Sequence, residues 1–409
     1  MTLRILFVAD GRSPIARGWI EPLIERGHSV HLASTFPSEP LAGLQSFHNV
    51  NVGFSGLGRR KRGAVKAPGG AGGIRLRSLL KHWLGPLTVF PAAGRLRRVM
   101  ENVDVDLVHA LRIPFEAMVT TQAEPMPPTV ISVWGNDFTL HAQSSPWMRS
   151  LTKRAVRKAD GLHADCQRDV RLAFDWGLRK DTPTIVLPGG GGIDREIFRP
   201  GVPLDLPMRE PVREMLTRIP EGVPVVINPR GFRAYVRNDT FFRSIRLILD
   251  EHPDTHFLLP GMSGEGRAER WLNELEIHAQ THLLPTLDQY EMAALYRRAW
   301  AVVSPSEHDG TPNSFLEAIA CGCYPIVGDL ESLREWVEPD RNGELVDPAD
   351  AVQLAKAVSD AISDPVRRAE AQAINQAIVD RRAARHVVTD SAEAFYGMVL
   401  RNLGSNNHA

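Results

Sequence analysis

The sequence has little cysteine. Only three of its 409 residues are cysteines, too few for a disulfide framework, and this scarcity favours a reducing, cytoplasmic setting. Cys321 and Cys323 stand one residue apart in an apolar stretch, with no second Cys or His pair near them. We therefore interpret these two residues as small core residues rather than metal ligands.

Long apolar runs are also missing. No stretch approaches the ~20 apolar residues that a membrane-spanning helix needs, so we expect no transmembrane segment. Asp10 interrupts the opening MTLRILFVAD, and we expect a strand there rather than a signal peptide. The following DGRSPIARG does not fit the pattern GxGxxG, which counts against a dinucleotide-dependent oxidoreductase.

The formal net charge is zero, but charges of the two signs are unevenly distributed. Residues 1–185 hold 25 Lys and Arg against 15 Asp and Glu, whereas residues 186–409 hold 23 against 33. The first part should therefore attract an anionic partner. We do not expect that partner to be nucleic acid, because the sequence has no zinc finger, no basic strand interleaved with aromatic residues and no repeat.

Apolar strands alternate with amphipathic helices in the first half. The predicted strands are Ile5–Ala9, Ser29–Ala33, Val50–Phe54, Leu107–Ala110 and Thr129–Val133. The predicted helices are Trp19–Arg26, Leu87–Val99 and Ser150–Ala159. This alternation is typical of a parallel sheet covered by helices on both faces. The segment GRRKRGAVKAPGGAGG, rich in glycine and cations, predicts a surface loop.

The alternation restarts after TIVLPGGGGIDREIFRP. We interpret this segment as a domain boundary and not as a phosphate-binding loop, because no Lys-Ser/Thr pair follows its glycines. The predicted strands are Val223–Asn228, Thr255–Leu259, Thr281–Leu284, Ala301–Pro305 and Tyr324–Val327. The predicted helices are Phe241–Glu251, Glu265–His278, Gln289–Ala299, Ser314–Ala320 and Leu330–Val337. The predicted fold class is α/β, with two Rossmann-like domains that bind ligands in the cleft between them.

The stretch SPSEHDGTPNSFLEAIACGCYPIV is the richest in chemistry. A polar loop carrying Asp309 leads into a helix that we expect to begin near Ser314, with Ser314 or Asn313 as its N-cap. The amides and dipole of such a helix start form an anion site. Glu317, expected in the first turn, would then point past a phosphate to neutral hydroxyls such as a ribose diol. The alternative is a helix capped by its own acidic residue.

This stretch resembles the signature of retaining glycosyltransferases with two Rossmann-like domains (GT-B), specifically glycosyltransferase family four. The matching positions are Asp309, Gly310-Thr311-Pro312, Glu317, Ala318, Ala320 and Gly322. The resemblance implies that Glu317 holds the ribose of the nucleotide and that Asp309 bonds the transferred sugar. It also implies that the amides from Gly310 through Asn313 to Ser314 meet the sugar and the phosphate.

The stretch VINPRGFRAYVRND is similar to the family's segment that brings an Arg and then a Lys onto the donor pyrophosphate. Arg230 matches the Arg, whereas the Lys is missing and Arg237 or Arg233 would have to replace it. Two cations there would offset the charge of the departing nucleoside diphosphate, as a metal does elsewhere. The resemblance therefore implies no cofactor and no catalytic metal. The alternative is a surface arginine cluster.

In the first half, DLVHALRIP and VISVWGNDFTLHA are similar to strand ends that line the acceptor side of the family's cleft. His109 keeps a common histidine and is a candidate catalytic residue, although a lone histidine at a strand end is more often structural. The candidate acceptor-side residues are Trp134, Asn136 and Asp137. In DGRSPIARGW, Gly18 matches a glycine near the donor phosphates.

These matches predict four segments: an acceptor-binding domain at 1–185, a linker at 186–200, a nucleotide-sugar-binding domain at 201–385 and a C-terminal helix at 386–409. The implied activity is transfer of a sugar from a nucleotide-sugar donor to a lipid-linked, surface-glycan or small-molecule acceptor, with retention of anomeric configuration. The alternatives are a nucleotide-sugar epimerase or hydrolase and a non-catalytic sugar-nucleotide sensor on the same fold.

One basic cluster stands outside these motifs. Its members lie in the glycine-rich segment of the first half: Arg59, Arg60, Lys61, Arg62 and Lys66. We interpret the cluster either as a solvated loop or as a contact with an anionic membrane at its inner face, where each cation contributes about 1 kcal/mol. The second interpretation makes the protein cytoplasmic and peripheral.

Overall fold

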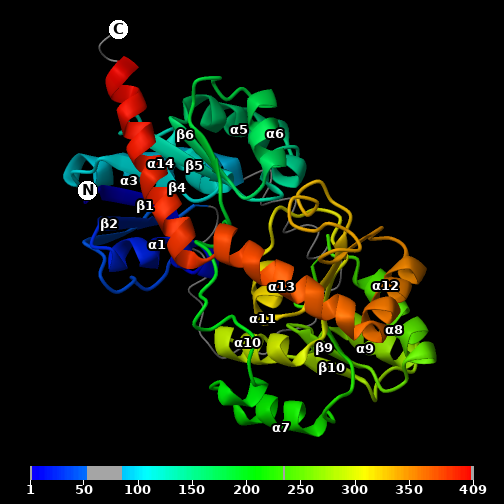
Figure 1. Cartoon of the computed structure of the whole chain (residues 1–409). Helices are drawn as coiled ribbons and strands as arrows, with labels where there is room; N and C mark the ends of the chain where they lie inside the picture. The colour runs from blue at the N-terminus through cyan, green and yellow to red at the C-terminus, as the bar shows by residue number, and fades with distance from the viewer. Residues whose placement is uncertain (1, 53–84, 234, 407–409) are drawn as a thin grey trace, which may run out of the picture. The chain divides into compact units, whose positions relative to one another are not determined.

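The structure is a computed structural model that describes residues 2–52, 85–233 and 235–406. The chain forms two compact units: unit 1 comprises Met1–Gly192 and Val388–Ala409, and unit 2 comprises Ile193–Val387. The last helix, α14 (Arg385–Asn406), therefore begins in unit 2 and returns to unit 1. In Figure 1, where it is red, α14 lies against the blue strands of unit 1.

Unit 1 is built on a seven-stranded sheet with the order β3-β2-β1-β4-β5-β6-β7. All neighbouring strands are parallel. The strands are β1 (Arg4–Ala9), β2 (Ser29–Ser34), β3 (Ser46–Asn49), β4 (Leu107–Ala110), β5 (Thr129–Val133), β6 (Gly161–Ala164) and β7 (Thr184–Val186). The helices, besides α14, are α1 (Pro14–Glu25), α3 (Val89–Asn102), α4 (Met118–Thr120), α5 (Pro146–Lys158) and α6 (Gln167–Asp175), with short helical turns η2 (Gly85–Thr88), η3 (Ile113–Ala117) and η4 (Asp137–His141).

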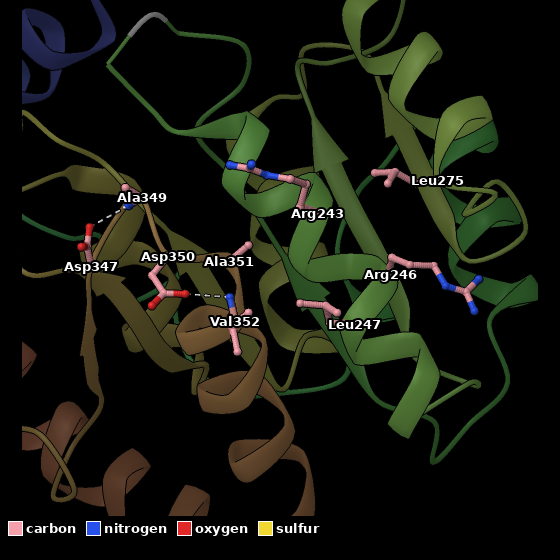
Figure 2. A pocket seen from close by; sticks show the side chains of 9 residues that line it. All are labelled: Arg243, Arg246, Leu247, Leu275, Asp347, Ala349, Asp350, Ala351 and Val352. Atoms are coloured by element: carbon pink, nitrogen blue, oxygen red, sulfur yellow. Dashed lines mark hydrogen bonds between the residues drawn. The ribbon is translucent and has the colours of Figure 1, made fainter.

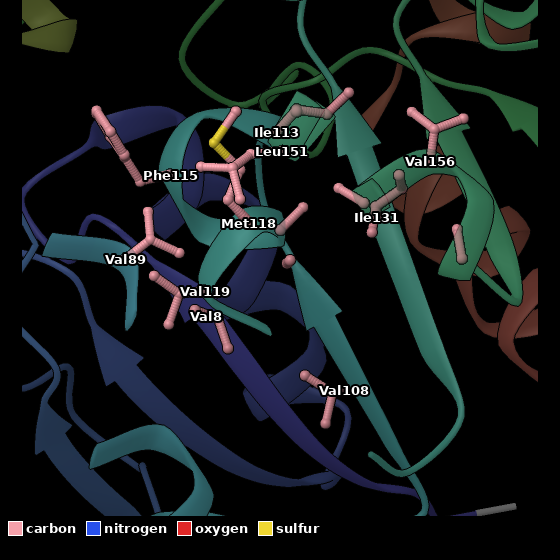
Figure 3. Close-up of a cluster of buried hydrophobic side chains, with 14 of the residues drawn as sticks. Val8, Val89, Val108, Ile113, Phe115, Met118, Val119, Ile131, Leu151 and Val156 are labelled. Carbon is pink, nitrogen blue, oxygen red and sulfur yellow. The ribbon is translucent and has the colours of Figure 1, made fainter. Parts of the chain in front are cut away.

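Alternation along β1 builds a core on each face of this sheet, because successive strand side chains point to opposite faces. Ile5 and Phe7 pack with α1 and α14 in one apolar cluster. Leu6 and Val8 pack with α3, α4, α5 and α6 in another. Figure 3 shows part of the second cluster, in which strand and helix side chains meet above the sheet.

Unit 2 contains a six-stranded parallel sheet with the order β10-β9-β8-β11-β12-β13. Its strands are β8 (Val225–Ile227), β9 (His256–Pro260), β10 (Thr281–Leu284), β11 (Ala301–Ser304), β12 (Tyr324–Gly328) and β13 (Glu344–Val346). Its helices are η5 (Pro203–Asp205), α7 (Glu210–Arg218), α8 (Asn238–Glu251), α9 (Gly266–Glu274), α10 (Gln289–Arg298), α11 (Asn313–Cys321), α12 (Ala351–Ser363) and α13 (Pro365–Arg382). One face carries α7, α10, α11 and α13, and the other carries α8, α9 and α12.

Two predicted elements are wrong. The strand expected at Val50–Phe54 is preceded by β3, and Val50 and Val52 are buried residues after it. The helix expected at Leu330–Val337 is a series of turns. Tertiary hydrogen bonds accompany the turns. Ser332, within the segment, donates to the Asp309 carbonyl, and Asn342, beyond it, donates to the Trp336 carbonyl and accepts from the Glu338 amide.

Candidate functional site

The sheet of unit 2 has a switch point between β8 and β11, where the order of successive strands reverses. Arg230 lies in the loop after β8, and Asp309 lies in the loop after β11. Ligands of open parallel sheets bind outside the carboxyl ends of the strands at such a point. The two sequence-predicted residues therefore meet where a ligand is expected.

Arg230 is buried and is linked both to the loop that follows β11 and to the first turn of α11. Its Nη2 donates to the two Asp309 carboxylate oxygens at 2.9 and 2.8 Å, and its Nη1 donates to Ser314 Oγ at 3.1 Å. The remaining donor, Nε, has no hydrogen-bond partner among the residues that the structure describes. A buried guanidinium with an unused N–H is suited to an anionic oxygen of a ligand.

The start of α11 differs from the expectation. The helix begins at Asn313 with Pro312 in the N-cap position and no capping side chain, so the predicted cap at Ser314 or Asn313 is wrong. The reason is that the Ser314 hydroxyl bonds Arg230 instead. Gly310, Thr311 and Pro312 are buried, and Trp336 Nε1 donates to Thr311 Oγ1 at 2.9 Å, which fixes the loop before the helix.

Glu317 lies just beyond the first turn of α11 and is partly buried. The Tyr296 hydroxyl donates to its Oε2 at 3.4 Å. Burial raises the pKa of Glu317 to about 7, against the opposing effects of the Tyr296 hydrogen bond and the Arg230 charge. A carboxyl group in this state can accept from a hydroxyl and, when protonated, also donate to one.

The two candidates for the missing cation both have partners in unit 2. Arg237 donates from Nε and Nη2 to Asp239 and from Nη1 to Glu307, each at 2.9 Å. Arg233 is exposed and donates to the Tyr235 hydroxyl. A ligand phosphate would therefore compete with carboxylates for Arg237. The role of Arg237 in donor binding stays a prediction.

The sheet of unit 1 has its own switch point, between β1 and β4, and a cavity of about 460 Å³ opens there. The residues after β1, β2, β4 and β5 line it: Asp10, Arg12, Ser13, Phe36, Leu111, Arg112, Pro114, Phe115, Glu116, Trp134, His141 and Met148. Trp134, predicted on the acceptor side, is among them. This cavity has the size and position of a small-molecule site.

The other two predicted acceptor-side residues bind an arginine of this cavity. Asp137 is fully buried and accepts from Arg112 Nε at 3.0 Å, and Asn136 Oδ1 accepts from Arg112 Nη2 at 3.3 Å. Burial raises the pKa of Asp137, although the charge of Arg112 opposes the shift. Asp137 and Asn136 thus position Arg112, whose φ of 142° lies in a region that only glycine adopts easily.

His109 does not line the cavity. It is fully buried in a chain of five hydrogen bonds that runs from Trp19 through Tyr396, His109, Ser132 and His163 to the Leu187 carbonyl. Burial holds the pKa of both imidazoles well below its usual value, which favours their neutral forms. With both rings neutral, the indole N–H as a pure donor and the carbonyl as a pure acceptor give every proton in the chain one position.

The chain of hydrogen bonds ties α14 to the sheet of unit 1, because Tyr396 belongs to α14 and His109, Ser132 and His163 belong to three neighbouring strands. Both ring nitrogens of His109 bond protein atoms. This geometry supports a structural role for His109. Among the described residues of unit 1, no contact of His109 supports its predicted catalytic role, which stays a prediction.

Gly18 lies inside α1, where the chain segment after β7 packs against it. A Cβ at position 18 would stand 2.5 Å from the Gly190 carbonyl oxygen, and one at Gly191 would stand 2.2 Å from the Gly18 oxygen. Gly18 is thus needed for close packing of two backbones. The predicted contact of its amide with donor phosphate stays a prediction.

Sequence reasoning missed Glu116, which η3 places in the wall of the cavity. Its side chain is 4% exposed, and Thr35 Oγ1 donates to its Oε1 at 2.7 Å. No described residue bonds its Oε2. The signal in the sequence is the single acid inside the apolar run IPFEAMV, because a charge among buried positions is seldom there without a partner.

Two other features do not form comparable sites. Asp165, Cys166 and Asp169 are close enough to share a metal ion, but Arg168 donates to Asp169 and already supplies a cation. The hollow of Figure 2, about 620 Å³ beside α8 and α12, is lined in part by polar groups that already have partners: Asp350 caps α12 by accepting from Val352 N, and Arg246 pairs with Asp250 outside the lining.

Among the residues that the structure describes, no helix is both long and apolar enough to cross a membrane. The basic cluster Arg59, Arg60, Lys61, Arg62 and Lys66 lies outside the described residues.

Both units match models of known protein families. Residues 11–190 match "Glycosyl transferase 4-like domain", and residues 216–379 match "Glycosyl transferases group 1". A D-inositol 3-phosphate glycosyltransferase of Xylanimonas cellulosilytica is 27% identical over 222 residues, which are 53% of this chain and 52% of that protein. The chain thus spans about half the length of the curated relatives that it matches first.

Solved structures share the fold over nearly the whole chain. Sucrose-phosphate synthase from Thermosynechococcus elongatus has a TM-score of 0.74 at 17% identity, covering 97% of this chain and 99% of that one. Anabaena HepE, in complex with UDP and glucose, has a TM-score of 0.69 at 16% identity, covering 96% and 98%. With two parallel sheets, matches in both units and the Asp309–Glu317 signature in place, the chain belongs to the group 1 glycosyl transferases, a family of retaining enzymes with the GT-B fold.

Proposed function

We propose that this protein transfers a sugar from a nucleoside diphosphate sugar to a hydroxyl acceptor with retention of anomeric configuration. The observation that carries the proposal is the contact of buried Arg230 with Asp309 and Ser314 at the switch point of unit 2. Membership of the group 1 glycosyl transferases supports it. A structural neighbour was solved with UDP-glucose, which makes UDP-glucose the first donor to test.

Each residue of the site has a role in this proposal. Arg230, through its unused Nε–H, offsets the negative charge that grows on the departing nucleoside diphosphate, and fixed donors of this kind act most strongly where charge develops. Asp309 orients Arg230 and, through its carboxylate, bonds the transferred sugar. Glu317 bonds the ribose hydroxyls while the start of α11 meets the phosphates.

We propose further that the reaction needs no divalent metal, because Arg230 supplies positive charge where a metal acts in other transferases. The experiment incubates the full chain with UDP-glucose and an acceptor panel in excess EDTA and measures the release of UDP. Release that needs an acceptor identifies a transferase, and acceptor-independent release identifies a hydrolase. Activity lost in EDTA and restored by Mg²⁺ or Mn²⁺ contradicts metal independence. Proton NMR of the product tests retention.

A peripheral contact with anionic membranes is the second part of the proposal. Described residues that follow the basic cluster in the sequence add exposed apolar side chains: Leu87 in η2, Phe90 in α3 and Trp147 in α5. Arg95, Arg97 and Arg98 of α3 are exposed as well. Exposed apolar side chains among cations are typical of a surface that lies on a membrane.

Liposome co-sedimentation tests this contact with vesicles rich in anionic lipid. The variant carries serine at all five positions of the basic cluster. The matched control carries serine at five exposed, paired cations of unit 2: Arg218, Arg246, Arg334, Arg341 and Lys356. We expect binding by the wild type and the control at low salt, loss in the variant and weakening with salt. Absence of wild-type binding at low salt contradicts the contact.

A further inference from the structure

Apolar side chains form one half of the lining of the cavity of unit 1, and polar or charged side chains form the other half. The apolar lining residues are Phe36, Leu111, Pro114, Phe115, Trp134 and Met148. Phe115 and Met148 also belong to the apolar core, as Figure 3 shows for Phe115. Walls that continue into the core keep their shape, because protein interiors are closely packed. The cavity therefore presents a fixed apolar surface to its ligand.

The two arginines of the cavity are neutralised by neighbouring carboxylates. Arg12 donates from Nε and Nη2 to the two oxygens of Asp10, each at 2.9 Å, and lies 4.1 Å from the centre of the Phe36 ring. Arg112 donates to Asp137 and lies 5.7 Å from the Trp134 ring centre. Each guanidinium thus stacks on an aromatic wall beside an acid. A phosphate would gain less from these arginines than from unpaired ones, because the charge of each is already offset by a carboxylate.

Glu116 supplies an open hydrogen-bond acceptor in the lining of the cavity. Thr35 occupies its Oε1, whereas its Oε2 has no partner among the described residues. A hydroxyl group of a ligand fits this oxygen, because a buried acceptor left without a donor is unfavourable. A phosphate oxygen fits it poorly, because it would place a second negative charge beside a carboxyl group. Burial raises the pKa of Glu116 to about 7, so its own charge is also disfavoured there.

We infer that this cavity binds the acceptor and that the acceptor is an uncharged molecule with an apolar or aromatic face and a hydroxyl group that bonds Glu116. The inference rests on the proposed function, because a ligand of this cavity is an acceptor only if the protein transfers a sugar. It differs from the phosphorylated inositol in the names of the curated relatives. Hydroxyl selection falls to Glu116, and the apolar walls select the rest of the molecule.

Ligand-observed saturation-transfer NMR on the full chain tests the inference without a donor. The probes are a matched pair, phenyl β-D-glucoside and phenyl 6-phospho-β-D-glucoside, each at millimolar concentration. We expect the uncharged probe to bind and the phosphorylated probe to bind at least roughly tenfold more weakly, because both arginines of the cavity are already paired with carboxylates and the phosphate would lose water. D-inositol 3-phosphate, which has a charge and no apolar face, should not bind.

Three variants test whether the probe binds in this cavity. Glu116→Gln keeps the size of the side chain and weakens binding of phenyl β-D-glucoside severalfold, because an amide is a poorer acceptor than a carboxylate. Asp10→Asn removes the partner charge of Arg12 and should allow the phosphorylated probe to bind. Glu21→Gln, at an exposed position of α1, is the control and should leave both probes unchanged.

The outcomes separate this inference from the proposed function. Equal or tighter binding of the phosphorylated probe to the wild type overturns the inference, as does absence of binding by phenyl β-D-glucoside. Unchanged binding in folded Glu116→Gln, with folding checked by circular dichroism, overturns the role of Glu116. Calorimetry of UDP on the same sample tests unit 2 independently, so a chain that binds the glucoside but not UDP contradicts only the proposed transfer.

Discussion

Arg230 Nη2 bonds both carboxylate oxygens of Asp309 at 2.9 and 2.8 Å, although the two residues belong to different loops at the switch point of unit 2. Both side chains are largely buried. Removing one member of a buried ion pair leaves the other charge uncompensated, which is more costly than losing the pair as a whole. The pair therefore makes the candidate site sensitive to single substitutions.

Arg230→Ala should lower both activity and stability. We expect a loss of about 100- to 1000-fold in turnover, as for removal of a fixed donor to developing charge. The unfolding free energy should fall by about 3–5 kcal/mol, because Asp309 loses the arginine of a buried ion pair. Urea denaturation and UDP release measure the two effects. Arg246→Ala removes an exposed arginine of the same unit, and an equal effect of that control contradicts the assignment.

Glu317→Gln should weaken the binding of UDP about 10- to 100-fold, because hydrogen bonds of a charged group contribute about 1.5–3 kcal/mol. Calorimetry with UDP and with inorganic pyrophosphate separates the ribose role from a general electrostatic one. The ribose role predicts that only UDP binding changes. Glu274→Gln, exposed on α9, is the control. Equal changes for the two ligands would falsify the ribose assignment.

The sequence predicted the alternation of strands and helices well, because apolar runs bounded by Gly and Pro mark buried parallel strands. The bounds of β4, β5 and β10 agree with the prediction. Where the prediction was wrong, tertiary contacts that the sequence pattern does not show determine the local structure. The Leu330–Val337 segment has a helical apolar pattern, but Ser332 and Asn342 bond backbone groups around it.

For the site, the sequence identified Arg230, Asp309 and Glu317 through a local signature, and the structure brings Arg230 and Asp309 into contact. It gave no sign of the chain through His109 and Tyr396, which are far apart in sequence and meet only because α14 returns to unit 1. Glu116 was missed for the same reason, because its partner Thr35 follows another strand.

Tyr396→Phe should weaken the packing of α14 on the sheet of unit 1 and lower the unfolding free energy. Without the hydroxyl, the Trp19 indole N–H loses its acceptor and His109 Nδ1 loses its donor, and each unsatisfied buried group costs about 1–3 kcal/mol. Chemical denaturation measures the loss, and limited proteolysis should show earlier cleavage in α14. Tyr290→Phe changes an exposed tyrosine and should be neutral. A Tyr396→Phe effect as small as that of the control contradicts the hydrogen-bond chain.

Substitution of glycine by alanine should have opposite signs in two helices of unit 1. Gly18→Ala places a methyl group 2.5 Å from the Gly190 carbonyl oxygen, and the shift that this requires costs about 1–3 kcal/mol. Gly94→Ala on α3 meets no atom within 4 Å and should stabilise by about 0.5–1 kcal/mol, because alanine favours a helix interior. Thermal denaturation compares the two variants. Destabilisation by both, or by neither, contradicts the packing at Gly18.

Glu116 should make stability fall as pH rises. Burial raises its pKa from about 4.5 to about 7 in the folded chain, against the hydrogen bond from Thr35 and the charge of Arg112. Between these values the folded state holds a proton that the unfolded state has released, so raising the pH favours unfolding. The loss is at most about 3 kcal/mol and is complete above the folded pKa. His109 and His163, with lowered pKa values, act in the opposite direction below pH 6.5.

The contribution of Glu116 to the pH dependence is therefore isolated by subtracting the unfolding free energy of a variant that lacks the carboxyl group. The unfolding free energy of the wild type minus that of Glu116→Gln should fall between pH 5 and pH 8, because glutamine does not titrate while both proteins share the two histidines. Glu21→Gln, at an exposed position, should give a flat difference over the same range. A flat difference for Glu116→Gln would mean that the carboxyl group is already ionised in the folded chain. The cavity would then hold a permanent negative charge at Glu116, which would exclude a phosphate even more strongly.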